Sequence, residues 1–345
     1  MTLPPVDDLG DNLPDPTWAA IAQAVPDAPC RILHLSDLHL GTESEPVVRA
    51  LETLVERAQP TLMVVSGDIT QRARPGQFRA ARQLIERLQA RCGAPWLAIA
   101  GNHDIALFNL LARAAWPLRG FRNNISRDIE PEYNDAHTRV LGVSTVRRWR
   151  HKNGVVSPAQ VERVVERLQQ AAPGQLRVVV THQPVHVIRP ADHRHLLVGH
   201  QQAVRRWAEA GADLVLGGHL HVPYVRALVT APGGVLPALW AVQAGTALST
   251  RVRRAQPNSV NLILYRPAGL HGQDGHVQPA SVVVQQWDYE RADYAPNRSE
   301  GPAGNSAAWE PGAGWFVRRA QTDLLPPAEL ALAEGDRVVL PHPAP

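Results

Sequence analysis

Short apolar runs alternate with amphipathic segments along the chain from residue 31 onward. These runs, together with the small or polar residues that end them, are RILHLSD, TLMVVSGD, WLAIAGNHD, RVLGVST, LRVVVTH and ADLVLGGH. A short apolar run that ends at turn-forming residues is typical of a buried strand. We therefore predict a buried strand at each run.

The segments between these runs have apolar residues at the spacing of one helix face. Two predicted helices carry Val47, Leu51, Leu54, Val55 and Ala58, and Phe78, Ala81, Ile85 and Leu88. A third should begin after Ser157, because Ser157, Pro158 and Gln160 match an N-cap, a first-turn proline and a capping-box partner. A fourth helix is expected around residues 204–208.

No helical pattern follows residue 221, where LWAVQAG, SVNLILY and SVVVQQWD predict antiparallel strands. This order of elements indicates an α/β fold. We expect one domain at residues 29–290, preceded by an arm at 1–28 and followed by a Pro-, Gly- and Ala-rich tail at 291–345. Within that tail, the apolar segment 315–317 is expected to dock on the domain.

The composition is that of an ordinary globular protein, with 44% hydrophobic and 19% charged residues among 345. No apolar stretch approaches the roughly 20 residues of a membrane span, and the acidic N-terminus does not resemble a secretory signal. Cys30 and Cys92 are expected to be small buried residues, so we predict a reducing, cytoplasmic setting. The net charge of +3 is too small to indicate a nucleic-acid partner.

Residues that can bind metal ions follow the predicted strands. They are Asp37, His39, Asp68, Asn102, His103, Asp104, His182, His219 and His221. Loops beyond the carboxyl ends of such strands share one rim of the sheet. Residues two apart on an extended segment point the same way, so Asp37 with His39, and His219 with His221, should each reach one place. Carboxylate and imidazole ligands suit Mn, Fe or Zn, and the absence of thiols argues against a structural zinc knot.

The candidate ligands are too numerous for one ion and fit two ions that share a carboxylate. They are Asp37, His39, Asp68, Asn102, His182, His219 and His221. Two such cations can clamp the attacking and leaving oxygens of a displacement at phosphorus. A water that bridges them loses its proton near neutral pH and becomes the nucleophile.

The ordered blocks D-x-H, GD, GNHD, H and GHLH resemble the signature of the calcineurin-like metallophosphoesterases, over about residues 31–288. The residues within these motifs, LSDLHLG, SGDITQ, GNHD and GGHLH, resemble those of the bacterial class III cyclic-nucleotide phosphodiesterase branch. The resemblance implies a four-layer αββα sandwich of two mixed β-sheets flanked by helices, with a dinuclear site between them. It implies that one ion is held by Asp37, His39, Asp68 and His221, and the other by Asp68, Asn102, His182 and His219. His103 would face the phosphate, with Asp104 behind it as the orienting partner.

Subfamilies of this family differ in identifiable sequence motifs. The protein serine/threonine phosphatases carry the motifs GDxVDRG and GNHE. This chain has GDITQRA and GNHD at the corresponding places, so it does not resemble that subfamily. The absence of a tyrosine between Asp68 and Tyr133 separates the chain from the purple acid phosphatases. Gln183 follows the candidate ligand His182, where many relatives have a second histidine.

Further basic residues are candidates for substrate contact. Arg148, in the cluster of residues 147–152, and Arg251, beside Arg253, could either grip an anionic substrate or lie on solvated loops. His34 is expected in the core. Most of the histidines that follow the predicted ligand His182 are expected on the surface, with room for one at the substrate mouth; they are His186, His193, His195 and His200.

These patterns predict a phosphoesterase that depends on two transition-metal ions and hydrolyses small phosphodiesters, with 3',5'-cyclic nucleotides as a candidate substrate. The attacking group would be the metal-bridging hydroxide. A nuclease or nucleotide pyrophosphatase on the same site is the alternative if a basic groove leads to the metals. A non-catalytic scaffold would have lost ligands, yet every candidate is present. No membrane partner is expected.

Overall fold

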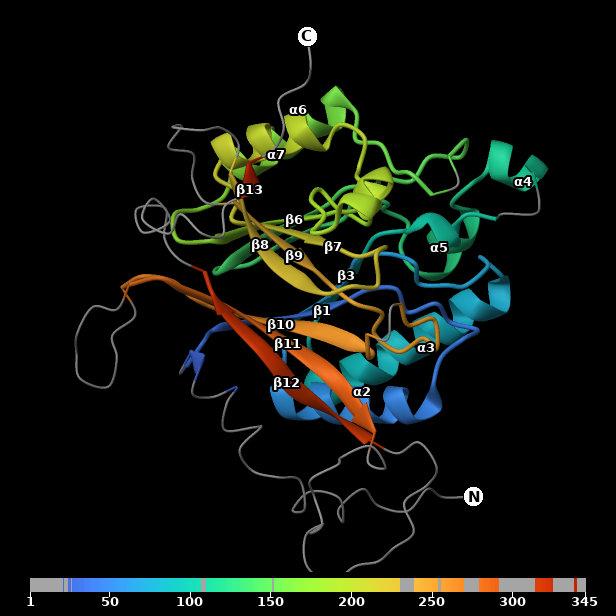
Figure 1. Cartoon of the computed structure of the whole chain (residues 1–345), viewed down its shortest axis with the longest axis horizontal. Coiled ribbons are helices and arrows are strands. Elements are labelled where there is room, and N and C mark those ends of the chain that lie inside the picture. The colour runs from blue at the N-terminus through green and yellow to red at the C-terminus, as the bar shows by residue number, and fades with distance from the viewer. Residues whose placement is uncertain are drawn as a thin grey trace, which may run out of the picture.

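The predicted apolar runs form the strands of two β-sheets that pack face to face (Figure 1). In the computed structural model, the described residues are 21, 24, 25, 27–106, 110–150, 152–229, 239–253, 256–269, 279–291, 314–324 and 338–339. No helix in these ranges is both long and apolar enough to cross a membrane.

The first sheet has six strands in the order β12-β11-β10-β1-β2-β3. Their bounds are β1 (Cys30–Leu35), β2 (Leu62–Val65), β3 (Trp96–Ala98), β10 (Ser259–Arg266), β11 (Ser281–Arg291) and β12 (Gly314–Asp323). Strands β1, β2 and β3 are parallel, whereas β10, β11 and β12 are joined antiparallel. The sheet is therefore mixed, as expected.

The second sheet has seven strands in the order β13-β8-β9-β7-β6-β5-β4. Their bounds are β4 (Glu132–Asn134), β5 (Thr138–Gly142), β6 (Leu176–Val180), β7 (Leu214–Gly217), β8 (Tyr224–Val229), β9 (Leu239–Gln243) and β13 (Val338–Val339). Strands β5, β6, β7 and β9 are parallel. Strand β4 pairs antiparallel with β5, and β8 pairs antiparallel with β9 and parallel with β13.

Helices cover the outer face of each sheet (Figure 1). Helices α2 (Glu45–Ala58) and α3 (Pro75–Cys92) pack on the first sheet, and α6 (Pro158–Gln169) and α7 (His200–Glu209) on the second. Between the sheets lies a separate apolar layer that includes Ile32, Val64, Val178 and Leu216. The expected four-layer αββα sandwich is confirmed.

Local sequence explains the helices. The apolar residues predicted for the first two helices are buried against the first sheet. At the start of α6, the backbone N–H of Gln160 donates to Ser157 Oγ at 3.3 Å, and the Ser157 N–H donates to Gln160 Oε1 at 3.1 Å. This capping box satisfies backbone donors that a helix start leaves open. Shorter helices are η2 (Asn102–Asp104), α4 (Leu110–Ala115), α5 (Arg119–Asn124) and η3 (Pro190–His195).

The structure also contains strands that the apolar pattern did not predict, namely β4, β8, β12 and β13. Strand β12 lies in the segment assigned to the tail, so the first sheet extends beyond residue 290. The Phe316 side chain is buried and its ring centroid lies 5.9 Å from that of Tyr289, while Trp315 and Val317 are half-buried. Residues 1–20 of the predicted arm lie outside the described residues.

Candidate metal centre

The loops that follow β1 and β2 lie against each other at one rim of the first sheet. The backbone N–H of Asp37 donates to Gly67 O at 3.0 Å, and the N–H of His39 donates to Asp68 O at 2.9 Å. The loops that follow β6 and β7 meet in the same way, through a 3.0 Å bond from Gly218 N–H to His182 O. The motifs of the sequence therefore gather where the two sheets meet.

Most of the candidate ligands have a left-handed backbone. The φ angles are 52° for Asp37, 48° for His39, 49° for Asp68, 71° for His219 and 56° for His221. The expectation that D-x-H and H-x-H are extended segments is therefore wrong. Non-glycine residues rarely adopt this conformation, and where they do it is often at functional sites.

The first cluster, half-site 1, consists of Asp37, His39 and His221. His221 Nε2 lies 3.1 Å from both Asp37 Oδ1 and His39 Nε2, and the distance from His39 Nε2 to Asp37 Oδ1 is 3.7 Å. The other carboxylate oxygen, Asp37 Oδ2, accepts hydrogen bonds from Ser36 Oγ and the His219 N–H. These bonds fix the carboxylate with Oδ1 directed at the histidines.

The second cluster, half-site 2, consists of Asp68, His182 and His219, with Asn102 beside them. His182 Nε2 lies 3.3 Å from Asp68 Oδ1 and 3.2 Å from Asn102 Oδ1. His219 and His221 thus belong to different clusters, and the expectation that they reach one place is wrong. Their left-handed backbone sends the two side chains to opposite half-sites.

Asp68 lies between the two half-sites. Its Oδ1 faces His182 at 3.3 Å, and its Oδ2 lies 3.8 Å from His39 Nε2 in half-site 1. Its side chain is almost completely buried. One carboxylate therefore presents an oxygen to each cluster, as a ligand shared by two ions would.

His103 lies beside both clusters, with its ring centroid 4.8 Å from that of His39. Its Nδ1 is 2.9 Å from Gln71 O, so the carbonyl accepts the Nδ1 proton and leaves Nε2 facing outward. Arg251 NH1 lies 3.4 Å from His103 Nε2 and donates to Gln71 Oε1 at 2.9 Å. Gln71, which is not among the residues predicted from the motifs, therefore contacts both His103 and Arg251.

Asp104 does not orient His103, so that expectation is wrong. Its carboxylate accepts hydrogen bonds from the N–H groups of Ile69, Thr70 and Gly101 at 3.1, 2.8 and 2.9 Å, and from Thr70 Oγ1 at 2.9 Å. The physical reason is the 3₁₀ turn of η2, which places successive side chains about a third of a turn apart. Asp104 faces inward and ties the loop after β2 to the loop after β3.

Burial and neighbouring charges shift the pKa values of the side chains in and beside the two half-sites. Burial alone would raise the pKa of Asp37, but the neighbouring imidazole of His221 holds that pKa well below its usual range. Burial alone would lower the pKa of His182, but the carboxylate of Asp68 raises it to about 9. For His219, burial and the nearby charge of His182 both lower the pKa, to about 3. Burial, followed by the charge of Asp68, raises the pKa of Asp104 to about 6.

The donor set fits metal ions. Among the described residues, Asp37 Oδ1 and His39 Nδ1 are buried without a hydrogen-bond partner. Buried carboxylates and imidazoles that converge in this way are costly unless a cation compensates them. Oxygen and imidazole ligands without thiolates match Mn, Fe or Zn.

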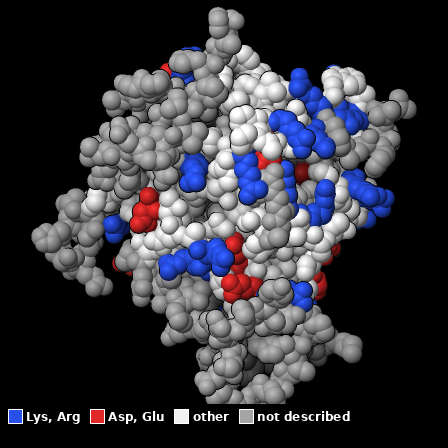
Figure 2. All heavy atoms as spheres, viewed as in Figure 1, with Lys and Arg blue, Asp and Glu red and all other residues white. Residues whose placement is uncertain are grey.

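Arg148 is not brought to this site. Its NH1 donates to Ala114 O at 2.8 Å and its guanidinium lies 5.0 Å over the Trp149 ring, so these contacts hold it on the surface beside α4. In Figure 2, Lys and Arg side chains gather over the region where α4 and α5 lie in Figure 1. Arg251, by contrast, reaches His103.

Other residues after β6 also have clear positions. Gln183 is buried, accepts from Thr145 Oγ1 at 2.6 Å and donates to Lys152 O at 3.2 Å, so it holds the loop after β5. His186 is buried, contrary to the expected surface position. His195 Nδ1 lies 3.1 Å from His219 Nε2, a contact that the sequence did not reveal.

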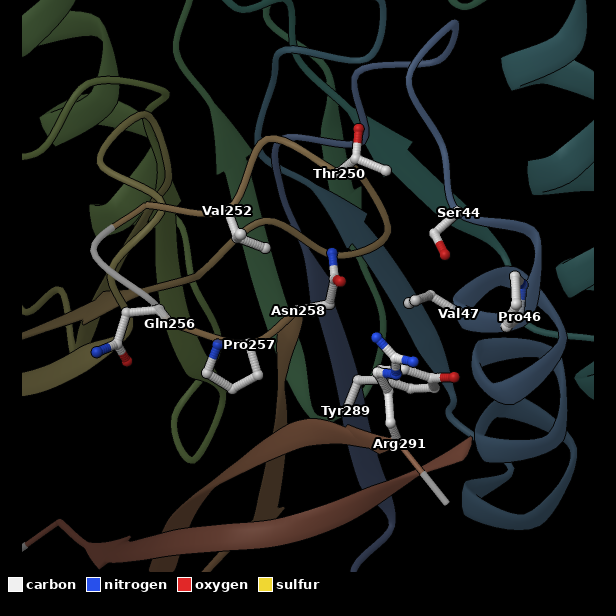
Figure 3. Close-up of a pocket in the computed structure, with 10 residues that line it drawn as sticks. All are labelled: Ser44, Pro46, Val47, Thr250, Val252, Gln256, Pro257, Asn258, Tyr289 and Arg291. Atoms are coloured by element: carbon white, nitrogen blue, oxygen red, sulfur yellow. The ribbon is translucent and has the colours of Figure 1, made fainter. Parts of the chain in front are cut away.

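A pocket of about 660 Å³ lies elsewhere, between the start of α2 and the segment 250–258 (Figure 3). It is lined by Ser44, Pro46, Val47, Thr250, Val252, Gln256, Pro257, Asn258, Tyr289 and Arg291. None of the candidate ligands lines it, and these side chains lack the convergent carboxylates and imidazoles of the two half-sites. The candidate site is therefore the pair of half-sites.

Comparison with known proteins finds relatives of this chain. A relative, a probable cyclic nucleotide phosphodiesterase of Synechococcus sp., is 25% identical over 215 residues, which cover 56% of this chain and 74% of that protein. A purple acid phosphatase from yellow lupin has a TM-score of 0.50 at 12% identity, over 73% of this chain and 53% of that one. A dimetal phosphatase from Danio rerio has a TM-score of 0.49 at 14% identity, over 75% of this chain and 96% of that one.

At 12% identity, the similarity to the lupin enzyme shows the fold alone. The family model described as calcineurin-like phosphoesterase, however, matches residues 30–223, more than half of the chain. The resemblance inferred from the ordered motifs is thereby confirmed, and the protein belongs to the calcineurin-like phosphoesterase family.

Proposed function

We propose that this protein is a two-metal phosphodiesterase that acts on small phosphodiesters, with a 3',5'-cyclic nucleotide as the favoured substrate. The observation that carries this proposal is that two clusters of carboxylate and imidazole groups share Asp68. One ion would be held by Asp37, His39, Asp68 and His221, and the other by Asp68, Asn102, His182 and His219. When bound, such ions polarise phosphoryl oxygens and supply a nucleophile at neutral pH.

His103 and Arg251 are suited to act on the phosphate. Because Gln71 O accepts the Nδ1 proton of His103, Nε2 is the nitrogen that faces outward, and a doubly protonated His103 would give its Nε2 proton to the leaving oxygen and keep the Nδ1 proton. Arg251, whose guanidinium lies beside that nitrogen, would bind a phosphoryl oxygen. The choice of a cyclic nucleotide is supported by the name of the Synechococcus relative and by the resemblance of the motifs to the class III branch.

The experiment is a metal and activity assay of wild type and Asp68→Ala. The protein is stripped with chelator, reloaded with Mn²⁺, and tested on bis-p-nitrophenyl phosphate, p-nitrophenyl phosphate, cyclic AMP and short DNA. Asp68→Ala should lose activity and most of both ions, whereas Asp323→Ala, which changes an exposed carboxylate of β12, should behave as wild type. An Asp68→Ala variant that retains two ions per chain would overturn the shared-ligand assignment.

A nuclease is the second candidate, because of the surface beside α4. Residues 105–127 and 146–152 contain no Asp or Glu, and Trp116 and Trp149 on these segments are 64% and 74% exposed. Exposed aromatic rings beside arginines suit the bases and phosphates of a single strand. Cleavage of short DNA faster than cyclic AMP would favour this candidate over the first.

The reducing, cytoplasmic setting is also part of the proposal. Its support is that Cys30 and Cys92 are both free thiols, the first buried and the second only half-buried.

A further inference from the structure

The candidate metal-binding histidines differ in what their second ring nitrogen contacts. His182 Nδ1 lies 2.9 Å from Ser66 O, and His221 Nδ1 lies 2.7 Å from Arg251 O. His39 Nδ1 has no hydrogen-bond partner among the described residues. His219 Nε2 contacts a side chain instead, the imidazole of His195 at 3.1 Å. Partners of this kind fix the orientation of a metal-binding ring.

The short helix that ends at His195 is held by a half-buried ion pair. His195 is the last residue of η3, which also contains Asp192, a residue only 3% exposed. Arg253 NH2 donates to Asp192 Oδ1 at 2.8 Å, and Arg253 NH1 donates to Leu220 O at 3.2 Å. Leu220 separates His219 from His221 in the sequence. Arg253 therefore joins η3 directly to the turn that carries both histidines.

We infer that His195 is a positioning residue that holds His219 in half-site 2, and that the ion pair between Arg253 and Asp192 holds His195 in place. His195 Nδ1 accepts the Nε2 proton of His219, which leaves His219 Nδ1 for the ion. This inference rests on the proposed two-ion site. It names a residue outside the ordered motifs as part of that site's support.

The same short segment then supports one histidine in each half-site. The backbone oxygen of Arg251 contacts His221 of half-site 1, and the side chain of Arg253, two residues later, supports His219 of half-site 2 through η3. The guanidinium of Arg251 also reaches His103. A displacement of segment 249–253 would therefore disturb both half-sites and the phosphate-binding groups together.

The test measures Mn²⁺ binding in three variants of His195. Asparagine places its Oδ1 near the position of Nδ1, glutamine reaches toward the position of Nε2, and alanine has no acceptor. We expect His195→Ala and His195→Gln to weaken binding of one of the two ions by about 10- to 100-fold, and His195→Asn to stay within about 3-fold of wild type. His193→Ala, an exposed histidine of the same short helix, is the matched control.

Electron paramagnetic resonance reports the result independently of activity. Wild type should give the signal of an interacting Mn pair, and His195→Ala at the same Mn²⁺ concentration should give the signal of an isolated ion. Arg253→Ala should have a similar effect, and the double variant His195→Ala with Arg253→Ala should be no worse than the single variants, because both act through one contact.

The outcomes separate the two proposals. If wild type binds two ions and His195→Ala binds both with unchanged affinity, the inference about His195 is overturned while the proposed function stands. If wild type does not bind two ions at all, the proposed function itself fails. Equal weakening in His195→Asn and His195→Ala would also overturn the inference, since it would show that the Nδ1 acceptor is not what matters.

Discussion

Asp104→Ala should destabilise the protein severely, although Asp104 is neither a candidate ligand nor in contact with the His103 ring. The substitution leaves the backbone N–H groups of Ile69, Thr70 and Gly101 without their acceptor, and these residues are buried. An unsatisfied buried donor costs about 1–3 kcal/mol. Allowing for partial rescue by water, we expect a loss of about 3–6 kcal/mol in the free energy of unfolding.

Asp104→Asn separates the loss of hydrogen bonds from the loss of charge. Its amide keeps one acceptor oxygen but turns an NH₂ group toward the donors, so we expect about half of the alanine effect. Both variants are unfolded in urea with chelator present, and tryptophan fluorescence is followed. Asp323→Ala is the control, with an expected change of about 0.5 kcal/mol or less.

The reasoning would be refuted if Asp104→Ala unfolded within about 1 kcal/mol of wild type. The same measurement with Mn²⁺ adds a second readout. Because Asp104 ties the loop that carries Asp68 to the loop that carries Asn102, the alanine variant should gain less stability from the metal than wild type does.

Three other substitutions test the site, the sheet and a buried carboxyl. His103→Ala should keep both metal ions and lose about 10²- to 10⁴-fold in kcat on cyclic AMP, but less on a p-nitrophenyl ester, whose leaving group needs no proton; equal losses in steady-state rates would contradict proton donation. Phe316→Ala should lower the unfolding free energy by about 3–5 kcal/mol in urea, and an unchanged midpoint would show that β12 does not pack as described. Burial raises the pKa of Asp213 to about 6 in the folded protein. Between the pKa of this carboxyl in the unfolded chain and pH 6, the unfolded state ionises more readily, so the free energy of unfolding falls as the pH rises. Asp213→Asn should therefore gain about 2 kcal/mol relative to wild type between pH 4.5 and 7.5, and thermal melts with no such trend would contradict this.

Sequence patterns predicted the elements whose cause is local. Ser157 and Gln160 form the predicted cap because all the atoms involved lie within one helical turn. The apolar runs became strands because most of their side chains are buried between a helix layer and the other sheet. Strand β12 escaped prediction because polar residues dominate its second half.

For the candidate site too, local sequence predicted some features and not others. The ligand types and their order in the chain are local facts, and they identified the residues that the fold brings together. The partners of those residues are not local. Gln71 contacts Arg251, and His195 contacts His219, only because separate loops meet at the rim. The pairing of His103 with Asp104 failed for the opposite reason, since neighbours in sequence diverge in a 3₁₀ turn.

The left-handed backbone of the candidate ligands shows why the fold, and not the motif, creates the site. For a non-glycine residue this conformation costs about 1–2 kcal/mol, so Asp37, His39 and Asp68 would not adopt it together in an isolated segment. The cost is offset by contacts between loops. The N–H groups of Asp37 and His39 donate to the loop after β2, and Thr246 Oγ1 donates to Asp37 O at 2.6 Å. Each loop therefore holds the other in a conformation that neither would keep alone, and the ligands converge only when both sheets are in place.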